Sequence, residues 1–297
     1  MSGAYWNDLR HHLGDSVESR FWLSDPLVRR RVNQRVSGDP QCWPVDWLRE
    51  YLAAVSPLPR ALSLGCGTGN LERDLCRKRI VQSIVGVDTA PDIVDYARAE
   101  SGREGFGPEQ IDFVVAEARE ILRRQRDLDA VFFHGSLHHF DRMEELLSLV
   151  EAALRPRGFL IIDEYVGPSM REWGWVSLLL PNLFYRCLPR SVRRVGLIRA
   201  PRNPADPSEM ICAAEIRPAI ESRFEVAAVR DYGGNLVSLL YANLRRPGSG
   251  PGSPTTEEFN HAIEFLLDGE DRMLRWPGPL RRPSFHTVMV GRTRAKA

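Results

Sequence analysis

The sequence predicts an α/β protein with a doubly wound sheet of seven strands, parallel except for one antiparallel strand. From residue 61 onward, short apolar runs alternate with longer amphipathic segments, the pattern of β–α–β units around a parallel sheet. A glycine-rich turn, Gly65-Cys66-Gly67-Thr68-Gly69, follows the first run directly. Polar residues follow several later runs, where ligands of open α/β sheets bind. Together these observations predict a Rossmann-like fold.

The chain divides into four segments by pattern. Residues 1–60 are rich in Trp and Arg and predict a helical extension, and residues 61–165 predict the ligand-binding core. Residues 166–222 predict a helical insertion that covers the site as a lid, and residues 223–297 complete the core sheet. The seven predicted strands are 61–64, 83–87, 112–115, 130–133, 159–162, 224–229 and 285–290.

Three helix starts carry recognisable capping signals. Asp25 before Pro26 places a cap and an N1 proline at the first helix. Asp141 precedes Glu144 by three residues and predicts a capping box. Asp206-Pro207-Ser208-Glu209 combines a cap, a proline and an N3 acid. A further amphipathic helix is predicted over residues 257–274, with apolar residues in period 3.6.

Composition excludes several classes of protein. The chain has 297 residues, of which 43% are hydrophobic, enough for a sizeable core. Lys and Arg number 40 against 39 Asp and Glu, so no net field favours nucleic acid or an acidic membrane. The five scattered cysteines indicate a reducing compartment, and the polar N-terminus lacks a secretory h-region. No apolar tract is long enough to span a membrane, and we expect a cytoplasmic protein.

The spacing of the glycines identifies the kind of ligand. A dinucleotide fingerprint G-x-G-x-x-G would place its third glycine at Asn70, so the NAD interpretation is disfavoured. The second predicted strand ends at Asp88, about 20 residues beyond the glycines, where an acid can accept hydrogen bonds from both hydroxyls of a ribose. The alternative for Asp88 is a cap on the following helix.

With these features, residues 60–165 resemble the class I S-adenosylmethionine (SAM)-dependent methyltransferases. The glycine turn is similar to the family's motif I, the acid after the third strand, Glu117, to its adenine contact, and His134–Phe140 to its segment after the fourth strand. Leu154-Arg155-Pro156-Arg157-Gly158 is close to its L-x-P-G-G turn, with Arg157 in place of one glycine. The resemblance implies SAM as cofactor, bound by Ser63, Gly65, Cys66, Gly67, Gly69, Asp88, Thr89, Glu117, Ala118 and His134.

This chain departs from the family pattern at three positions. Ser63 stands where the family commonly has an acid that helps to hold the SAM ammonium, and it supplies no countercharge. Glu72 is a candidate to compensate. Glu117 replaces a more usual Asp, and Arg157 replaces a glycine.

The resemblance implies methyl transfer to a small-molecule, glycan or lipid-linked acceptor. Holding donor and acceptor in line is then the main catalytic task, and a base is needed only for a hydroxyl or protonated amine acceptor. His138 and His139 are candidate bases, and Glu164 and Tyr165, just past the fifth strand, are further candidates. No metal ligand set is predicted.

The acceptor is less well defined by the sequence. The apolar tract 173–188, flanked by arginines, predicts a packed lid or an interfacial segment that contacts a membrane. Trp6 or Trp22 is a candidate to close over a ligand, the alternative being an extension that only covers the sheet edge. Two rival functions stay open: a non-catalytic SAM-binding protein, and an oxidoreductase that binds NAD or a nucleotide sugar.

Overall fold

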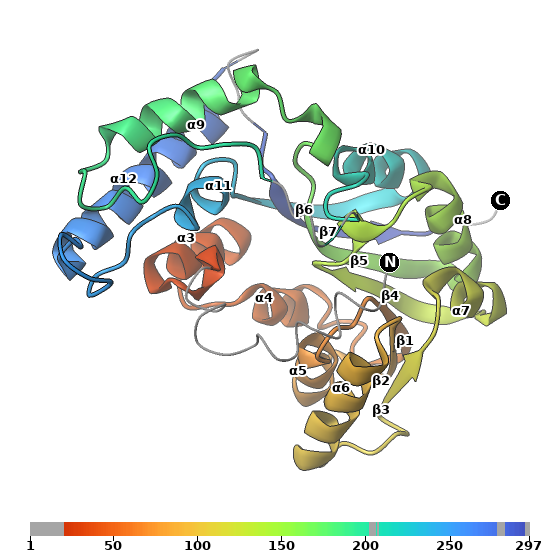
Figure 1. The fold of residues 1–297 in the computed structure, drawn as a ribbon. Coiled ribbons are helices and arrows are strands. Elements are labelled where there is room, and N and C mark those ends of the chain that lie inside the picture. The colour runs from red at the N-terminus through yellow and green to blue at the C-terminus, as the bar shows by residue number, and fades with distance from the viewer. Residues whose placement is uncertain (1–20, 202–205, 207, 278–282, 295–297) are drawn as a thin grey trace.

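The computed structural model describes residues 21–201, 206, 208–277 and 283–294. A seven-stranded sheet has the order β3-β2-β1-β4-β5-β7-β6 (Figure 1). Strand β7 is antiparallel to both neighbours, and the other pairs are parallel, as predicted. The strands are β1 (Leu58–Leu64), β2 (Val81–Asp88), β3 (Ile111–Val115), β4 (Leu128–His134), β5 (Leu154–Tyr165), β6 (Glu225–Gly233) and β7 (His286–Arg292).

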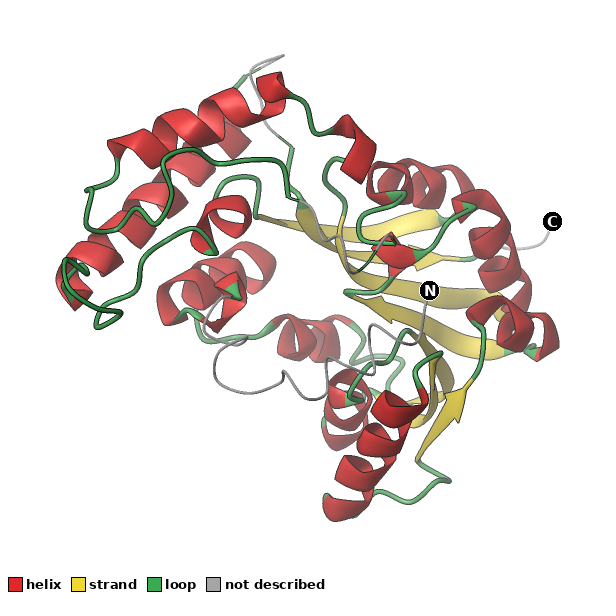
Figure 2. Cartoon of the chain, viewed as in Figure 1, coloured by secondary structure: helices red, strands yellow, loops and turns green. Residues whose placement is uncertain are grey.

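Helices cover both faces of the sheet, and its central strands carry apolar residues on both faces. Phe132 of β4 packs in the core on one face, and its neighbour Phe133 packs in the core on the other. The first face carries α5 (Asn70–Arg77) and α6 (Pro91–Arg103), and the second carries α7 (Ala118–Arg124), α8 (Met143–Ala153) and α10 (Ala213–Arg223) (Figure 2).

The N-terminal and C-terminal helices form one unit beside β6. Asp25 caps α3 (Pro26–Ser37) by accepting hydrogen bonds from two backbone amides, as predicted. Helix α4 (Pro44–Tyr51) follows it. Arg35 of α3 pairs with Glu270 (2.7 Å) and Asp271 (2.8 Å) of α12 (Thr256–Arg275), while Glu270 also accepts from the amides that open α11 (Val237–Tyr241). This buried network fixes segments that are over 200 residues apart in the chain.

Two predicted helix starts are wrong. Asp141 does not cap α8; its carboxylate pairs with Arg119 (2.8 Å), and Arg142, at φ 46°, precedes the helix. Helix α10 begins at Ala213, not at residue 206. Asp206 instead accepts hydrogen bonds from the amide and hydroxyl of Ser208 in a local turn. Pro207 and Trp6 lie outside the described residues. At both positions another interaction replaced the predicted cap. Asp141 pairs with a residue of another helix, and Asp206 forms a local turn instead.

Much of the insertion forms α9 (Trp175–Cys187), which lies beside α12 at the edge of the molecule farthest from β3 (Figure 1). Tyr185 is fully buried, but Trp175 is 75% exposed, and Val176, Leu179 and Leu183 are also exposed. Helix α9 therefore buries one face and leaves an apolar one open. None of the described helices has the length and hydrophobicity needed to cross a membrane.

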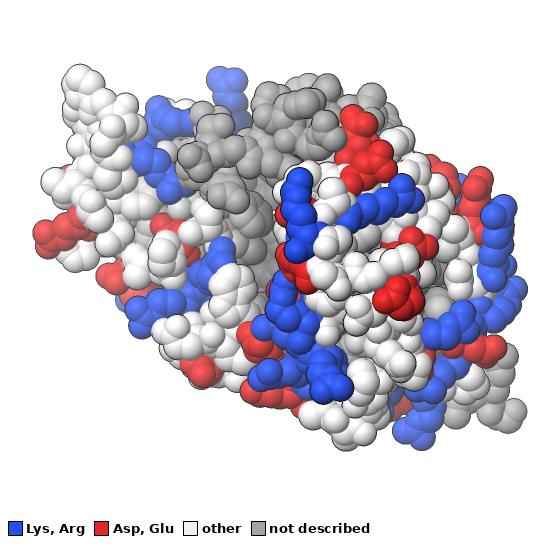
Figure 3. Space-filling view, turned by 90° about the horizontal axis from the view of Figure 1, so that it is seen from below, with Lys and Arg blue, Asp and Glu red and all other residues white. Residues whose placement is uncertain are grey.

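Charged side chains pair with one another over the described surface. Arg98 pairs with Asp95, for example, three residues earlier on α6. Acidic side chains lie next to basic ones on the face shown in Figure 3. The near-zero net charge thus reflects mixed pairs on the surface.

Candidate active site

Two cavities adjoin at the carboxyl ends of β1, β2, β4 and β5. One, of about 230 Å³, follows the glycine turn and Asp88. The other, of about 490 Å³, is enclosed by residues from the N-terminal helices, β4, β5, the insertion and the last two strands. His134 and Gly135, at the end of β4, line both. A ligand in the first cavity therefore lies next to one in the second.

Close packing explains why glycines form the turn. Gly65 and Gly69 have φ of 70° and 74°, values that favour glycine. A Cβ at Gly65 would lie 2.5 Å from the Cβ of Ser136, and one at Gly69 would lie 2.5 Å from the ring of Phe113. The backbone of the turn thus approaches β3 and the β4 loop as no larger residue would allow, and it leaves peptide groups open to the cavity.

Asp88 closes this cavity at the end of β2. One carboxylate oxygen accepts a hydrogen bond from the amide of Gly67 (3.1 Å), and the other accepts one from the amide of Ala90 (3.1 Å). The carboxylate therefore orients the glycine turn and also the start of α6. Because an ionised carboxylate has about four acceptor sites, it can still receive two hydroxyls.

Glu72 is an ionisable residue buried under the turn. Its side chain is 0% exposed and lines the cavity with Ser63. Neither of its carboxylate oxygens has a hydrogen-bond partner among the described residues. Burial raises the pKa of this carboxyl, although the adjacent Ser63 hydroxyl and the charges of His134 and Arg73 act in the opposite direction. A buried acid that faces a cavity without a partner fits a cationic ligand group such as an ammonium, because pairing would remove its desolvation cost.

The structure gathers six of the ten predicted cofactor residues around this cavity: Ser63, Gly65, Cys66, Gly67, Asp88 and His134. Glu117 is exposed before α7, Ala118 is buried in the core, and Thr89 and Gly69 do not line the cavity. Their roles stay predictions. Lining residues that the sequence analysis did not assign to the site are Thr68, Asn70, Leu71, Gly135 and Ser136.

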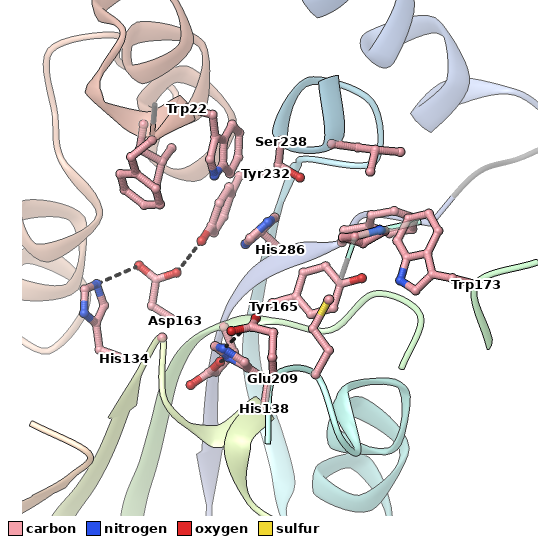
Figure 4. A pocket seen from close by; sticks show the side chains of 18 residues that line it. Trp22, His134, His138, Asp163, Tyr165, Trp173, Glu209, Tyr232, Ser238 and His286 are labelled. Carbon is pink, nitrogen blue, oxygen red and sulfur yellow. Dashed lines mark hydrogen bonds and ion pairs between the residues drawn. The ribbon is translucent and has the colours of Figure 1, made fainter. Parts of the chain in front are cut away.

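His138 and Glu164 form a buried pair in the second cavity (Figure 4). Glu164 accepts hydrogen bonds from the amides of Ser136 (2.6 Å) and Leu137 and from His138 Nδ1 (2.8 Å). Burial opposes its ionisation, but His138 and the two amides outweigh burial and lower the pKa of Glu164. Since an ionised carboxylate only accepts, His138 carries its proton on Nδ1.

The remaining nitrogen of His138 faces the cavity. Its Nε2 lies 3.7 Å from a carboxylate oxygen of Glu209. Burial lowers the pKa of His138, but the carboxylates of Glu164, Glu209 and Asp206 outweigh burial and raise it above the ordinary value. The arrangement is that of a general base held by an acid, with Nε2 as the proton acceptor.

The other two candidate catalytic residues have different surroundings. His139 does not line the cavity; its Nδ1 lies 3.3 Å from Asp206, and burial together with the nearby His138 lowers its pKa to about 4. Tyr165 does line it, but its hydroxyl donates to the carbonyl of Pro168 (3.0 Å), and burial raises its pKa. Tyr165 therefore lines the cavity as a neutral phenol, which is a poor base.

One donor atom each from His138, His139 and Glu209 lies within 4.8 Å of the other two, close enough to hold a metal ion. No metal was predicted from the sequence. Both imidazoles contact carboxylates, Glu164 for His138 and Asp206 for His139. Any test of His138 as a base should therefore include a chelator.

Aromatic side chains form the walls of the second cavity. Trp22 lies 6.4 Å from the ring of Tyr232 and 4.9 Å from that of His286, centroid to centroid. The Tyr232 hydroxyl donates to Asp163 (2.6 Å), which lies 3.7 Å from His134 (Figure 4). Trp22 thus lies where the sequence analysis suggested contact with a ligand. Asp163, Tyr232 and His286 were missed there, although Asp163 immediately precedes the predicted Glu164.

Comparisons with known proteins agree with this geometry. Residues 62–162 match the model of a methyltransferase domain. The chain is 29% identical to a demethylmenaquinone methyltransferase of Thermus thermophilus over 45% of this chain and 66% of that protein. It is 31% identical to a trans-aconitate 2-methyltransferase of Escherichia coli over 42% of this chain and 50% of that protein. The first curated relatives are matched over only 40% to 66% of their length.

Solved structures agree at the level of the fold. A geranyl diphosphate methyltransferase in complex with GPP and sinefungin is similar with a TM-score of 0.51 at 12% identity, over 84% of this chain and 76% of that one. The sheet order with its antiparallel β7, the glycine turn and the matched domain converge on one family. By the matched model and the fold, residues 62–162 form a methyltransferase domain of the class I type, which uses S-adenosylmethionine as its cofactor.

Proposed function

We propose that this protein transfers the SAM methyl group to a small molecule bound in the 490 Å³ cavity. The observation that carries the proposal is that the donor and acceptor cavities share His134 and Gly135. In-line transfer requires the two reacting atoms to be about 3–3.5 Å apart, so the two sites must adjoin. A cofactor site without such a neighbour would instead favour a non-catalytic role.

Residues of the smaller cavity bind and orient the donor. Glu72 pairs with the ammonium of SAM, and Asp88 accepts hydrogen bonds from the ribose hydroxyls. The peptide groups of the glycine turn hold the amino-acid end of SAM. SAM supplies an electrophilic sulfonium methyl when bound. Glu72 thus provides the countercharge that Ser63 lacks.

Residues of the larger cavity position and activate the acceptor. His138 Nε2 removes a proton from the acceptor, while Glu164 holds the imidazole in the required tautomer. Trp173 and Glu209 of the insertion complete the walls, so segment 166–222 acts as a lid over the acceptor. Enclosure excludes water from the reacting atoms.

Calorimetry tests the donor site. S-adenosylhomocysteine should bind the wild-type protein, and NAD should not. Glu72→Gln should weaken binding of SAM by about 10- to 100-fold, because a hydrogen bond to a charged group contributes about 1.5–3 kcal/mol. Glu72→Gln keeps the side-chain shape, and a thermal melt checks the fold. Binding of NAD alone would refute the proposal, and unchanged affinity in Glu72→Gln would remove this acid from the site.

The exposed face of α9 is the second feature that bears on the acceptor. Trp175, Leu179 and Leu183 recur at intervals of four residues on this face, and Arg186 and Arg190 beside them are exposed. An apolar stripe bordered by arginines favours binding to a membrane with anionic lipid, where an apolar acceptor would be reached.

Co-sedimentation with phosphatidylglycerol vesicles tests this contact. The double variant Trp175→Ser, Leu179→Ser should bind the vesicles at least fivefold more weakly than wild type, because it removes apolar area from the face that enters the lipid. Trp43→Ser, which changes an exposed tryptophan before α4, serves as the control. Equal binding by wild type and the double variant would exclude α9 as a membrane contact.

A further inference from the structure

We infer that the acceptor is an amine that enters the larger cavity as a cation with an aromatic or apolar body. The inference rests on the proposed function and specifies its substrate class. Three features of the cavity carry it: the sign of its charged residues, one carboxylate without a strong partner, and its aromatic walls.

The charges that line the cavity are unusual for this chain. Lys and Arg supply 40 of the 297 residues, yet none of the 18 described residues that line the cavity is Lys or Arg, although three are histidines. Three of those residues are acids, Asp163, Glu164 and Glu209. Burial raises the pKa of Asp163 and of Glu209, while the nearby imidazoles of His134 and His138 act in the opposite direction, so an incoming cation would favour the ionised form of both acids. The cavity therefore attracts a cation and repels a carboxylate or a diphosphate.

The three acids differ in the partners that they already have. Glu164 is held by two amides and His138, and Asp163 accepts from Tyr232. Among the described residues, the carboxylate of Glu209 has only His138 Nε2 at 3.7 Å, beyond hydrogen-bond distance. Its carboxylate faces the cavity beside the proposed base (Figure 4). An ammonium group placed there would pair with Glu209 and lie within reach of His138.

Aromatic rings from separate parts of the chain surround this acid. Trp22, Tyr165, Trp173, Tyr232 and Phe285 all line the cavity, and Tyr165 and Trp173 each pack edge-to-face on Phe285, at 6.0 and 5.9 Å between centroids. The faces of such rings attract cations, and a desolvated cation–π contact contributes about 2 kcal/mol. The same rings accommodate an apolar or aromatic body.

The chemistry of an amine acceptor uses each of these groups. The bound ammonium gives one proton to His138 Nε2, which leaves a neutral amine with a free lone pair. That lone pair forms the new N–C bond as the C–S bond to the donor breaks and its electron pair stays on sulfur. The products are a methylated ammonium, which still pairs with Glu209, and the neutral thioether. The proton on His138 then leaves to solvent.

Three indoles that differ only in the end of their side chain test the inference. Tryptamine carries an ammonium, tryptophol a hydroxyl and indole-3-propionate a carboxylate. Each is titrated by calorimetry into protein saturated with S-adenosylhomocysteine, so the readout is binding. Tryptamine should bind at least tenfold more tightly than tryptophol, and indole-3-propionate should bind most weakly.

A matched variant identifies the residue that selects the charge. Glu209→Gln should weaken tryptamine binding about five- to tenfold, as expected for a partly exposed charge pair of about 1 kcal/mol or slightly more, and leave tryptophol unchanged. Glu215→Gln, on the exposed side of α10, should change neither. Equal or tighter binding of indole-3-propionate, or no binding of any indole, would overturn the amine inference. Failure of S-adenosylhomocysteine to bind would instead overturn the proposed function.

Discussion

Asp88→Ala is expected to weaken SAM binding at least 100-fold. The carboxylate accepts hydrogen bonds from the amides of Gly67 and Ala90. In the proposed donor site it also receives the ribose hydroxyls, so its loss would remove ligand contacts and loosen the glycine turn. Two hydrogen bonds to a charged group contribute about 3 kcal/mol or more together, which corresponds to a factor of at least about 100. Calorimetric titration with SAM measures the effect.

Two further variants separate ligand contacts from folding. Asp95→Ala removes the same charge from an exposed position on α6, where the acid pairs with Arg98, and should leave SAM affinity unchanged. Asp88→Asn keeps the size of the side chain and should fall between Asp88→Ala and wild type. SAM affinity in Asp88→Ala within threefold of wild type would show that Asp88 only caps α6.

His138→Ala is expected to slow methyl transfer by about 100- to 10,000-fold, the usual contribution of a general base, while SAM binding is retained. Turnover is measured as S-adenosylhomocysteine release with an amine acceptor. In wild type, kcat/KM should fall as pH decreases through the pKa of His138, because the imidazolium cannot accept a proton. Burial lowers that pKa, but the carboxylates of Glu164, Glu209 and Asp206 outweigh burial and raise it above its ordinary value.

Controls for His138 address the fold, the neighbouring histidine and metal. His138→Asn keeps a donor for Glu164 but has no base, so it should fold like wild type and react slowly. His139→Gln should keep the acidic limb of the pH profile, since His139 lies outside the cavity. Each rate is measured with and without EDTA. A rate in His138→Ala equal to wild type would remove the residue from the mechanism, and loss of wild-type activity in EDTA would assign it to a metal instead.

Sequence patterns predicted the parts of the fold whose causes are local. The first strand, predicted over 61–64, begins three residues earlier at Leu58, and the turn at 65–69 follows it because an apolar run meets alternate glycines. The Asp25 cap follows from adjacent residues. Asp141 shows the limit of this reasoning. Its capping signal is intact in the sequence, but Arg119, from the preceding helix, takes its carboxylate.

Local patterns sufficed to predict the glycine turn and the placement of Asp88 at the end of the next strand, because a strand, its turn and the next strand end lie within about 30 residues. The acceptor cavity could not be predicted in this way. Trp22, Glu209 and Tyr232 come from three distant segments, and long-range packing brings them around His138. The sequence also could not show that the carboxylate of Glu72 is buried without a hydrogen-bond partner among the described residues, because burial and partners depend on how distant segments pack around a side chain. The charge and shape of the acceptor cavity therefore depend on contacts between distant segments, and no local sequence pattern predicts those contacts.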